Sequence, residues 1–175
     1  MCAAECGKRG RKVLVVDHAD KVGKKILISG GGRCNFTNLN ILPERFLSEN
    51  KHFCKSAFSQ FDQHDFIALV QKHGIKFHEK KLGQQFCDES AQQIVDMLLA
   101  ECAESGAKVQ MNTTIEGITH TEGTYTVKTS EGAYTAQSLV IATGGLSIPI
   151  SSSRMEPPTS KSLIAVILPP THIVE

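Results

Sequence analysis

The chain has 175 residues, of which 41% are hydrophobic and 21% are charged, an ordinary composition for a globular protein. The formal net charge of +1 gives no reason to expect nucleic acid or an acidic membrane as a partner, so we expect a small-molecule substrate and neither nucleic acid nor a membrane. No apolar run approaches the ~20 residues of a membrane span, and the N-terminus has no secretory signal pattern. We therefore expect a cytoplasmic protein, with its oligomeric state left open.

The cysteines and histidines give no sign of a metal site. The six cysteines contain no C-x-x-C pair, and the seven histidines contain no H-x-x-x-H spacing. Cys2 and Cys6 lie one helical turn apart, which is typical of helix packing. We interpret all six cysteines as reduced thiols and predict no metal.

The first residues have the pattern of a helix that leads directly into a buried strand. Residues 1–8 are small and helical in composition, and Gly7 and Gly10 suit a helix stop and a turn. Residues 12–16 are a β-branched apolar run that Asp17 closes. This is the second half of a β-α-β unit whose first strand is missing from the sequence.

The middle of the chain alternates between helical and extended patterns. Asp62 is a plausible N-cap for a helix that ends at Gly74, and Ser90-x-x-Gln93 is a capping box for a helix that ends at Gly106. The other predicted elements are a short helix within 43–59 and strands at 75–78, 82–87 and 108–112.

The last third reads as a β-meander followed by a tail of a different kind. Residues 115–121, 124–129 and 133–142 alternate in polarity and are separated by Glu-Gly turns. The proline-rich residues 151–175 show no amphipathic period, so we expect them not to pack like the rest.

Three signals fall where ligands bind in open α/β sheets, outside the carboxyl ends of strands: Asp17, residues 29–38 and residues 142–145. An acidic residue at the end of a second strand can accept hydrogen bonds from the ribose of a dinucleotide. The alternative for Asp17 is a turn former or a helix cap.

The stretch ILISGGGRCNFTN, residues 26–38, is the strongest of these signals. Successive glycines allow positive φ and close approach of backbone N–H groups to a ligand, and Arg33, Asn35 and Asn38 add polar groups suited to phosphate or a heterocycle. It is not a P-loop, and its alternative is a flexible connector. Lys25 is a candidate phosphate contact. Cys34 is either a reactive thiol or inert packing, and we favour packing because no activating group is placed beside it by the sequence.

Three segments resemble the bacterial YhiN/BaiN-like flavoproteins, NAD(P)/FAD-dependent oxidoreductases with two dinucleotide-binding domains. These segments are GKRGRKVLVVDHADKVGKKILISGGGRCNFTN, FHEKKLGQQFCDESAQQIVDMLL and LVIATGGLSIP. The resemblance covers about residues 1–149. It implies an α/β fold in the form of a partial Rossmann-like FAD-binding domain. This domain lacks the first strand and the GxGxxG turn, and it carries an inserted β-meander.

The resemblance also implies a set of FAD-binding positions. Asp17 takes the ribose-binding place, Val109 lies where adenine is touched through backbone, and Gln84 and Phe86 match a family segment to which we assign no role. The glycine stretch lies near the flavin, and the second glycine motif returns the chain to the cofactor. The residues of these two segments are Ser29, Gly30, Gly31, Gly32, Arg33, Cys34, Asn35, Thr37 and Asn38, and Ala142, Thr143, Gly144 and Gly145.

The chain departs from the family at both ends. It starts inside the helix whose N-terminus would hold the FAD pyrophosphate, and the sequence after Pro149 is unlike the family. We therefore predict a partial FAD-binding domain over residues 1–149 and an aberrant tail over 150–175, as a frameshift would produce.

Our prediction is a fragment of an FAD-dependent oxidoreductase. The intact protein would pass electrons from NAD(P)H or another donor through flavin to an unsaturated organic acceptor. No catalytic residue is assigned. The alternatives are a catalytically inactive product of a degraded gene and a non-redox nucleotide-binding regulatory module.

Overall fold

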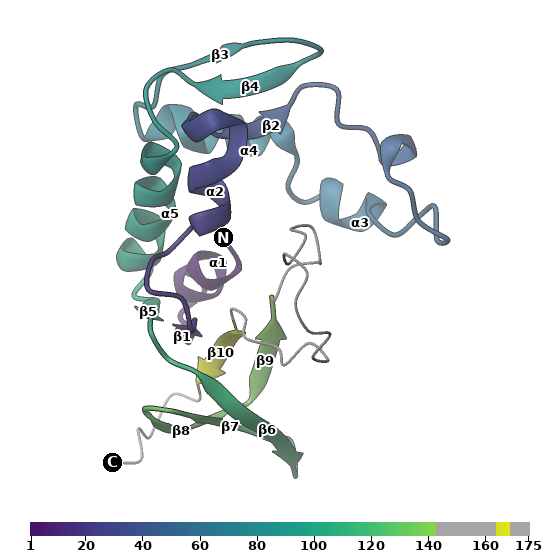
Figure 1. Cartoon of the computed structure of the whole chain (residues 1–175). Coiled ribbons are helices and arrows are strands. Elements are labelled where there is room, and N and C mark those ends of the chain that lie inside the picture. The colour runs from purple at the N-terminus through teal and green to yellow at the C-terminus, as the bar shows by residue number, and fades with distance from the viewer. Residues whose placement is uncertain (143–163, 169–175) are drawn as a thin grey trace, which may run out of the picture. The chain divides into compact units, whose positions relative to one another are not determined.

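The computed structural model describes residues 1–142 and the backbone of residues 164–168. The chain divides into two compact units, one made of Met1–Val22 with Leu99–Glu175, and the other of Gly23–Leu98 (Figure 1). Each unit has its own β-sheet structure and its own apolar core. The predicted boundary after residue 149 lies outside the described residues.

The first unit is built on a four-stranded sheet with the order β5-β1-β10-β9. Its strands are β1 (Lys12–Val16), β5 (Lys108–Gln110), β9 (Ser138–Ile141) and β10 (Ile164–Leu168). β1 pairs parallel with β5, and β10 is antiparallel to both β1 and β9. β5, β1 and β9 therefore run in one direction, which agrees with the predicted Rossmann-like α/β class.

Helix α1 (Cys2–Lys8) packs beside this sheet and leads into β1, as predicted. Ala3 and Ala4 on α1 pack with Val13 and Val15 of β1 and with Cys102 in one apolar cluster. Such small residues let a helix approach a strand closely.

The β-meander is confirmed, with one correction at its end. β6 (Ile115–Thr121), β7 (Thr124–Thr129) and β8 (Gly132–Ala136) form a three-stranded antiparallel sheet. The predicted single strand over 133–142 is wrong, because this run is divided between β8 and β9, which belong to different sheets. Ala136 is buried with Val127 in the meander, whereas the chain from Ser138 onward pairs with β10. The alternation of polar and apolar residues does not reveal where a chain changes from one sheet to another.

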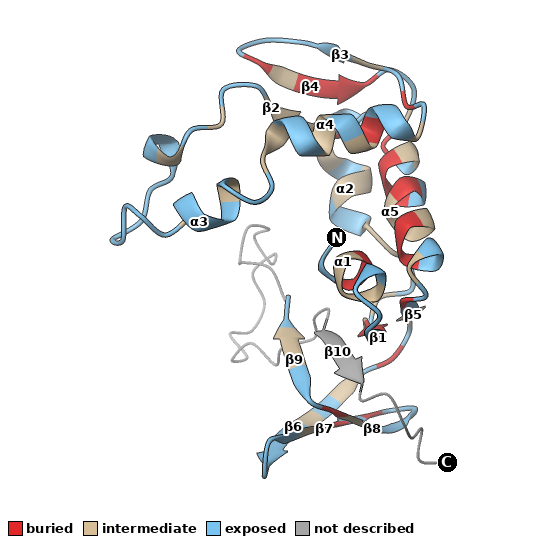
Figure 2. Cartoon of the chain, turned by 180° about the vertical axis from the view of Figure 1, so that it is seen from behind, coloured by how far each residue is buried: buried red, intermediate tan, exposed pale blue. Residues whose placement is uncertain are grey.

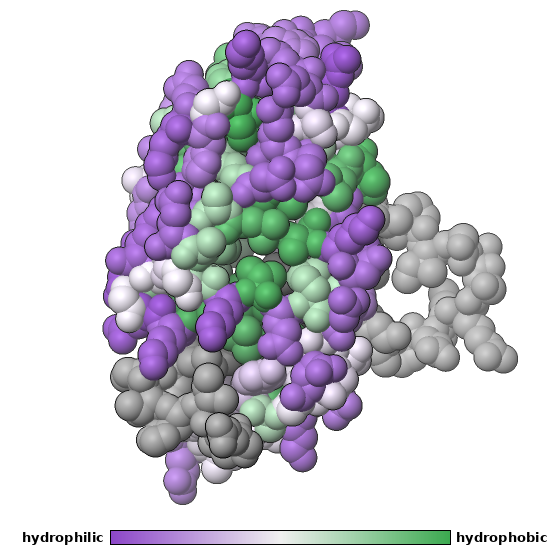
Figure 3. Space-filling model, turned by 90° about the vertical axis from the view of Figure 1, so that its left-hand side faces the viewer, coloured by the Kyte–Doolittle hydropathy of each residue, from purple (hydrophilic) through white to green (hydrophobic). Residues whose placement is uncertain are grey.

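The second unit joins short helices to a three-stranded antiparallel sheet with the order β2-β4-β3. Its strands are β2 (Asn35–Asn38), β3 (Phe77–Glu79) and β4 (Gln84–Cys87). Its helical segments are α2 (Lys24–Ile28), the 3₁₀ turns η1 (Ser29–Gly32) and η2 (Pro43–Arg45), α3 (Lys55–Phe58), α4 (Gln63–Lys72) and the start of α5 (Gln92–Glu104). Figure 2 shows buried residues on β4 and along one side of α5, whereas α3 and the loop before it are exposed. The face seen in Figure 3 exposes hydrophobic as well as hydrophilic residues.

Two helix starts were predicted from capping patterns, and the structure confirms one fully. The Asp62 carboxylate accepts from the backbone N–H groups of His64 and Asp65, and the Asp65 carboxylate accepts from the N–H of Asp62. At α5 only half of the predicted box forms. The Ser90 hydroxyl accepts from the N–H of Gln92, but the Gln93 amide donates to Glu89 instead of closing the box.

The tail prediction needs a correction as well. Within residues 151–175 the described segment is β10, which pairs with β1 on one side and β9 on the other, so this part of the tail belongs to the sheet. A short β-branched run without amphipathic period fits a strand paired on both sides, a possibility that the proline content of the flanking residues obscured. No helix among the described residues is long and apolar enough to cross a membrane.

Candidate functional site

The glycine stretch is a turn between a short helix and a strand. Residues 24–28 are helix α2, so the prediction that this stretch follows a strand is wrong. Ile26 and Leu27 pack in the core of the second unit while Ile28 is exposed, which is the one-sided burial of a helix. An apolar run of three residues is too short to show whether its residues repeat with the period of a helix or of a strand.

The backbone of the turn uses the freedom that the glycines give. Gly30, Gly31 and Gly32 have φ values of 59°, 68° and 87°, all in the left-handed region that glycine adopts without strain. A Cβ on Gly30 would lie 2.6 Å from Cε1 of Phe86, whereas a Cβ on Gly31 or Gly32 would meet nothing within 4 Å. Gly30 therefore serves packing, and Gly31 and Gly32 present bare backbone to open space.

The residues after the glycines alternate between surface and core. Arg33 and Asn35 are exposed, whereas Cys34 is 4% exposed and packs with Cys87 in the core of the unit. Burial raises the pKa of the Cys34 thiol, and a hydrogen bond from Ser29 offsets part of the rise. This placement agrees with the packing role that we favoured for Cys34 over a reactive thiol.

Thr37, Asn38 and Lys25 complete the predicted residues of this unit. The Asn38 side chain donates to the carbonyl of Leu82 at 3.0 Å and accepts from the N–H of Asn40 at 2.7 Å, so it fastens β2 to the β3–β4 turn. Thr37 pairs with Gln85 in the sheet, and Lys25 is exposed on α2. Ten predicted positions, Lys25 and those within 29–38, thus fall in one helix-turn-strand segment.

The remaining described positions lie in the first unit, two of them at one edge of its sheet. Ile164 of β10 pairs with Val16 and also with Ile141, so the ends of β1 and β9 are level and Asp17 and Ala142 follow them at the same edge. Asp17 Oδ1 accepts from the N–H of Ala19 at 3.0 Å, the turn-forming role that was its alternative. Val109 pairs with Val15, and its side chain packs against the apolar cluster under the sheet. Thr143, Gly144 and Gly145 lie outside the described residues.

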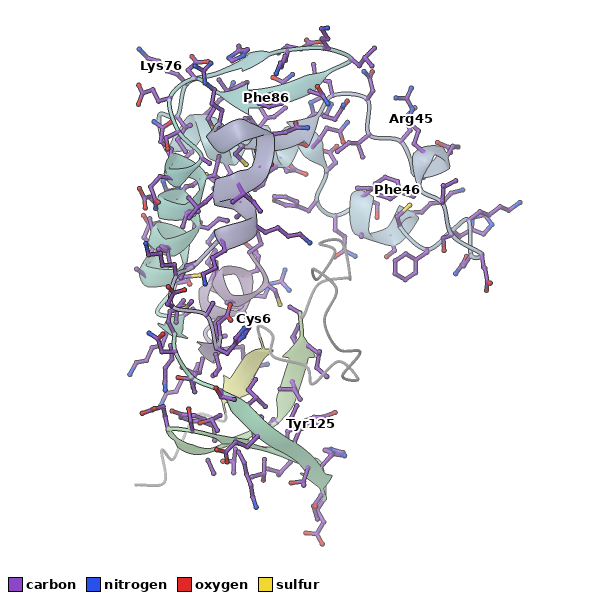
Figure 4. All side chains as sticks on the ribbon, in the orientation of Figure 1. Cys6, Arg45, Phe46, Lys76, Phe86 and Tyr125 are labelled. Atoms are coloured by element: carbon purple, nitrogen blue, oxygen red, sulfur yellow. The ribbon has the colours of Figure 1, made fainter. Side chains whose placement is uncertain are left out.

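The sequence analysis missed a histidine–aspartate pair, His78 with Asp88, beside the β2-β4-β3 sheet. Nδ1 of His78 lies 2.7 Å from Oδ1 of Asp88, and the His78 ring stacks on Phe86 with centroids 6.4 Å apart. Nζ of Lys80 lies 4.9 Å from the centroid of the same Phe86 ring (Phe86 is labelled in Figure 4). β3 and β4 are separated by a tight turn in the sequence. A hairpin between them would have been expected to bring His78 opposite Phe86, so this signal was present in the sequence.

The described residues contain no cluster of three or more histidine, cysteine or acidic side chains that could hold a metal ion. For the whole protein, the absence of a metal stays a prediction.

The comparisons with known proteins agree with this architecture. The model of the family described as "HI0933-like protein Rossmann domain" matches residues 1–171. The chain is 52% identical over 148 residues to "Ribosomal RNA dihydrouridine synthase" of Escherichia coli (strain K12), covering 85% of this chain and 37% of that protein. It is 45% identical over 152 residues to the protein of the same name from Haemophilus influenzae, covering 85% of this chain and 38% of that one.

A more distant relative is "3-dehydro-bile acid delta(4,6)-reductase" of Clostridium scindens, 22% identical over 135 residues, covering 77% of this chain and 33% of that protein. The chain thus spans little more than a third of the length of the curated relatives that it matches.

Proposed function

Since the chain belongs to the HI0933-like protein Rossmann domain family, we propose that it is part of an FAD-dependent reductase that acts on a uridine of ribosomal RNA. The observation that carries this proposal is the 52% identity to the E. coli ribosomal RNA dihydrouridine synthase over 148 residues. The substrate named by that relative is an unsaturated organic acceptor, the class that we expected from the sequence.

The glycine turn fits a flavin ring edge. A Cβ at Gly31 or Gly32 would meet no atom within 4 Å, so there is space beside this backbone for a planar ring, with Arg33 and Asn35 exposed on either side of the buried Cys34. In this proposal residues 29–35 hold the flavin, and the ribose-binding place of Asp17 stays an expectation from the family resemblance. When bound, FAD supplies two-electron transfer between a reduced nicotinamide and the substrate.

The chemistry of the substrate suits such a cofactor. Dihydrouridine differs from uridine by two hydrogens across one carbon–carbon double bond, so its formation requires two electrons and two protons. The delta(4,6)-reductase name of the distant relative also denotes reduction of carbon–carbon double bonds. We propose NAD(P)H as the electron donor.

The proposed RNA substrate departs from our expectation of no nucleic-acid partner, which rested on the net charge of +1. A small net charge gives no general attraction to phosphate, so specific contacts would have to supply the affinity.

The experiment that tests the proposal has a binding arm and an activity arm. The purified chain is expected to bind added FAD, measured by the quenching of flavin fluorescence. Expression of the E. coli relative with this chain in place of its matched residues, in a strain without that enzyme, is expected to restore dihydrouridine in ribosomal RNA, measured by mass spectrometry. A chain that folds but binds no FAD contradicts the proposal and favours the inactive product or the non-redox module.

Gly31→Leu and Gly123→Leu form a matched pair for the binding arm. Both glycines have positive φ, 68° and 78°, and neither has an atom within 4 Å of an added Cβ, so the backbone strain is alike. Only Gly31 lies in the glycine turn. We expect Gly31→Leu to lose FAD and Gly123→Leu to retain it, and equal retention would contradict the placement of the flavin.

A further inference from the structure

The face of the β2-β4-β3 sheet that carries Asn35 also carries a histidine held by a carboxylate. His78 pairs with Phe86 across β3 and β4, and Phe86 pairs with Asn35 across β4 and β2. Directly paired residues point to the same face of a sheet, so the three side chains form one row. The neighbouring pair, Phe77 and Cys87, belongs to the apolar core on the opposite face.

This row is joined to the glycine turn by Phe86. One edge of the Phe86 ring lies against Gly30, where an added Cβ would come within 2.6 Å, and His78 stacks on the same ring at an interplanar angle of 23°. The Phe86 ring is thus a neighbour of both Gly30 and His78. All of these residues belong to the second unit, so their spacing depends on that unit alone.

The contact with Asp88 determines what the imidazole can do. A carboxylate accepts hydrogen bonds and does not donate them, so Nδ1 of His78 donates to Asp88 across 2.7 Å. This leaves Nε2 as the ring nitrogen that can exchange a proton with a ligand. The His78 and Asp88 side chains are 46% and 41% exposed, so a substrate can reach the ring without any rearrangement.

We propose that His78 is the proton donor to the substrate and that Asp88 is its positioning residue, an inference that rests on the proposed reduction of a carbon–carbon double bond. Reduced FAD, when bound, would supply a hydrogen with both electrons to one carbon of the double bond and would itself be oxidised. The adjacent carbon takes a proton from Nε2 of protonated His78, which regains a proton from water. The substrate gains two hydrogens and two electrons, so atoms and charge balance.

A second candidate donor in this unit, the Cys34 thiol, is less suitable. Cys34 is buried in the core of the unit, so a substrate at the surface does not reach it, and burial raises the pKa of its thiol. Lys80, which lies over the Phe86 ring, supplies positive charge beside His78 and suits contact with a phosphate of the substrate.

The first test measures contact and needs neither FAD nor turnover. In the full chain, the Cε1–H signals of His78 and His64 are followed by NMR while a short uridine oligonucleotide is added. His64 is the control because it is exposed on α4 and lies outside the row. We expect the His78 signal to shift in a saturable way and the His64 signal to stay. A His78 signal that does not move at saturating oligonucleotide, or that moves no more than that of His64, overturns the inference.

The second test separates the two half-reactions of the FAD-loaded full chain by stopped-flow spectroscopy. We expect His78→Gln to keep FAD and its rate of flavin reduction, but to slow flavin reoxidation by the oligonucleotide about 100-fold or more, the usual range for a general acid. Asp88→Asn should slow the same step by a smaller factor, Asp88→Glu should restore most of it, and His64→Gln should change nothing.

Equal reoxidation rates in His78→Gln and the unchanged chain overturn the inference while leaving the proposed function intact. A chain that retains no FAD contradicts the proposed function instead, and the NMR measurement then decides the inference alone.

Discussion

The α-carbon of Gly30 lies against the ring of Phe86, so closely that a Cβ at Gly30 would be 2.6 Å from Cε1. The same Cβ would also lie 2.9 Å from the backbone nitrogen of Asn35. This contact joins the glycine turn to the β2-β4-β3 sheet and makes glycine obligatory at position 30 for two reasons, the positive φ and the lack of space.

The comparison of Gly30→Ala with Gly31→Ala separates these two reasons. Both positions have positive φ, which costs alanine roughly 1 kcal/mol, but only alanine at 30 also meets the ring, which adds roughly 1–3 kcal/mol. We expect urea unfolding to show a clearly lower free energy of unfolding for Gly30→Ala than for Gly31→Ala. Equal losses would mean that Phe86 moves away at no cost.

Thiol labelling tests the burial of the cysteines in the second unit. Burial and the neighbouring Cys34 raise the pKa of Cys87 to about 11, and burial raises that of Cys34, so at pH 8 both remain protonated and shielded. We expect an aromatic disulfide reagent to label the exposed Cys2 rapidly in the native chain. Cys34 and Cys87 should react only after unfolding, as mass spectrometry of the labelled peptides would show. Rapid native labelling of Cys34 would revive the reactive thiol that the structure argues against.

Local signals in the sequence predicted much of the fold because their causes are local. The apolar run of β1 and the Asp62 cap each act through neighbouring residues, and each appears where expected. The glycine turn was recognised as a special backbone for the same reason. Its residues were also grouped correctly in one segment, although whether they bind FAD stays a prediction.

Pairing between distant segments was the part that the sequence could not reveal. The pairing of β9 with β10 depends on strand register, which an isolated segment does not encode. The contact of His78 with Asp88 instead lies within one hairpin, whose register could have indicated it. The helical state of α2 was missed for a related reason, because its burial against the core of the unit decides between helix and strand.

The ion pair of Lys8 with Glu101 gives a prediction for the first unit. Glu101 is 1% exposed and lies 2.7 Å from Nζ of Lys8, and this hydrogen bond, more than the one to Glu5, raises the pKa of Lys8. A pKa raised in the folded state stabilises the fold below the ordinary value of 10.5, so the contribution is fully present at pH 7 and is lost as pH rises through the folded pKa.

We expect Lys8→Met to lower the free energy of unfolding by about 2 kcal/mol at pH 7, because the buried Glu101 carboxylate loses a partner. Lys8 is partly exposed to solvent, so the loss is smaller than for a fully buried ion pair. Glu5→Gln is the matched control, since Glu5 contacts the same Nζ at 3.2 Å but is exposed, and we expect it to change the free energy by less than about 0.5 kcal/mol. Equal effects of the two substitutions would show that burial of Glu101 contributes nothing.

The capping box at α4 gives a pH-dependent prediction with a definite sign. The backbone N–H of Asp65, followed by that of His64, lowers the pKa of Asp62 below its ordinary value of 3.8. A pKa lowered in the folded state stabilises the fold above the unfolded value, and this contribution is lost as pH falls through the folded pKa. Asp62→Asn keeps a side-chain oxygen for the cap but has no charge to lose. We therefore expect the variant to melt below the unchanged chain at pH 7, and the difference in melting temperature to close as pH falls below 3.8. A difference that persists unchanged at the lowest pH at which both chains fold would show that shape, and not charge, makes Asp62 the better cap.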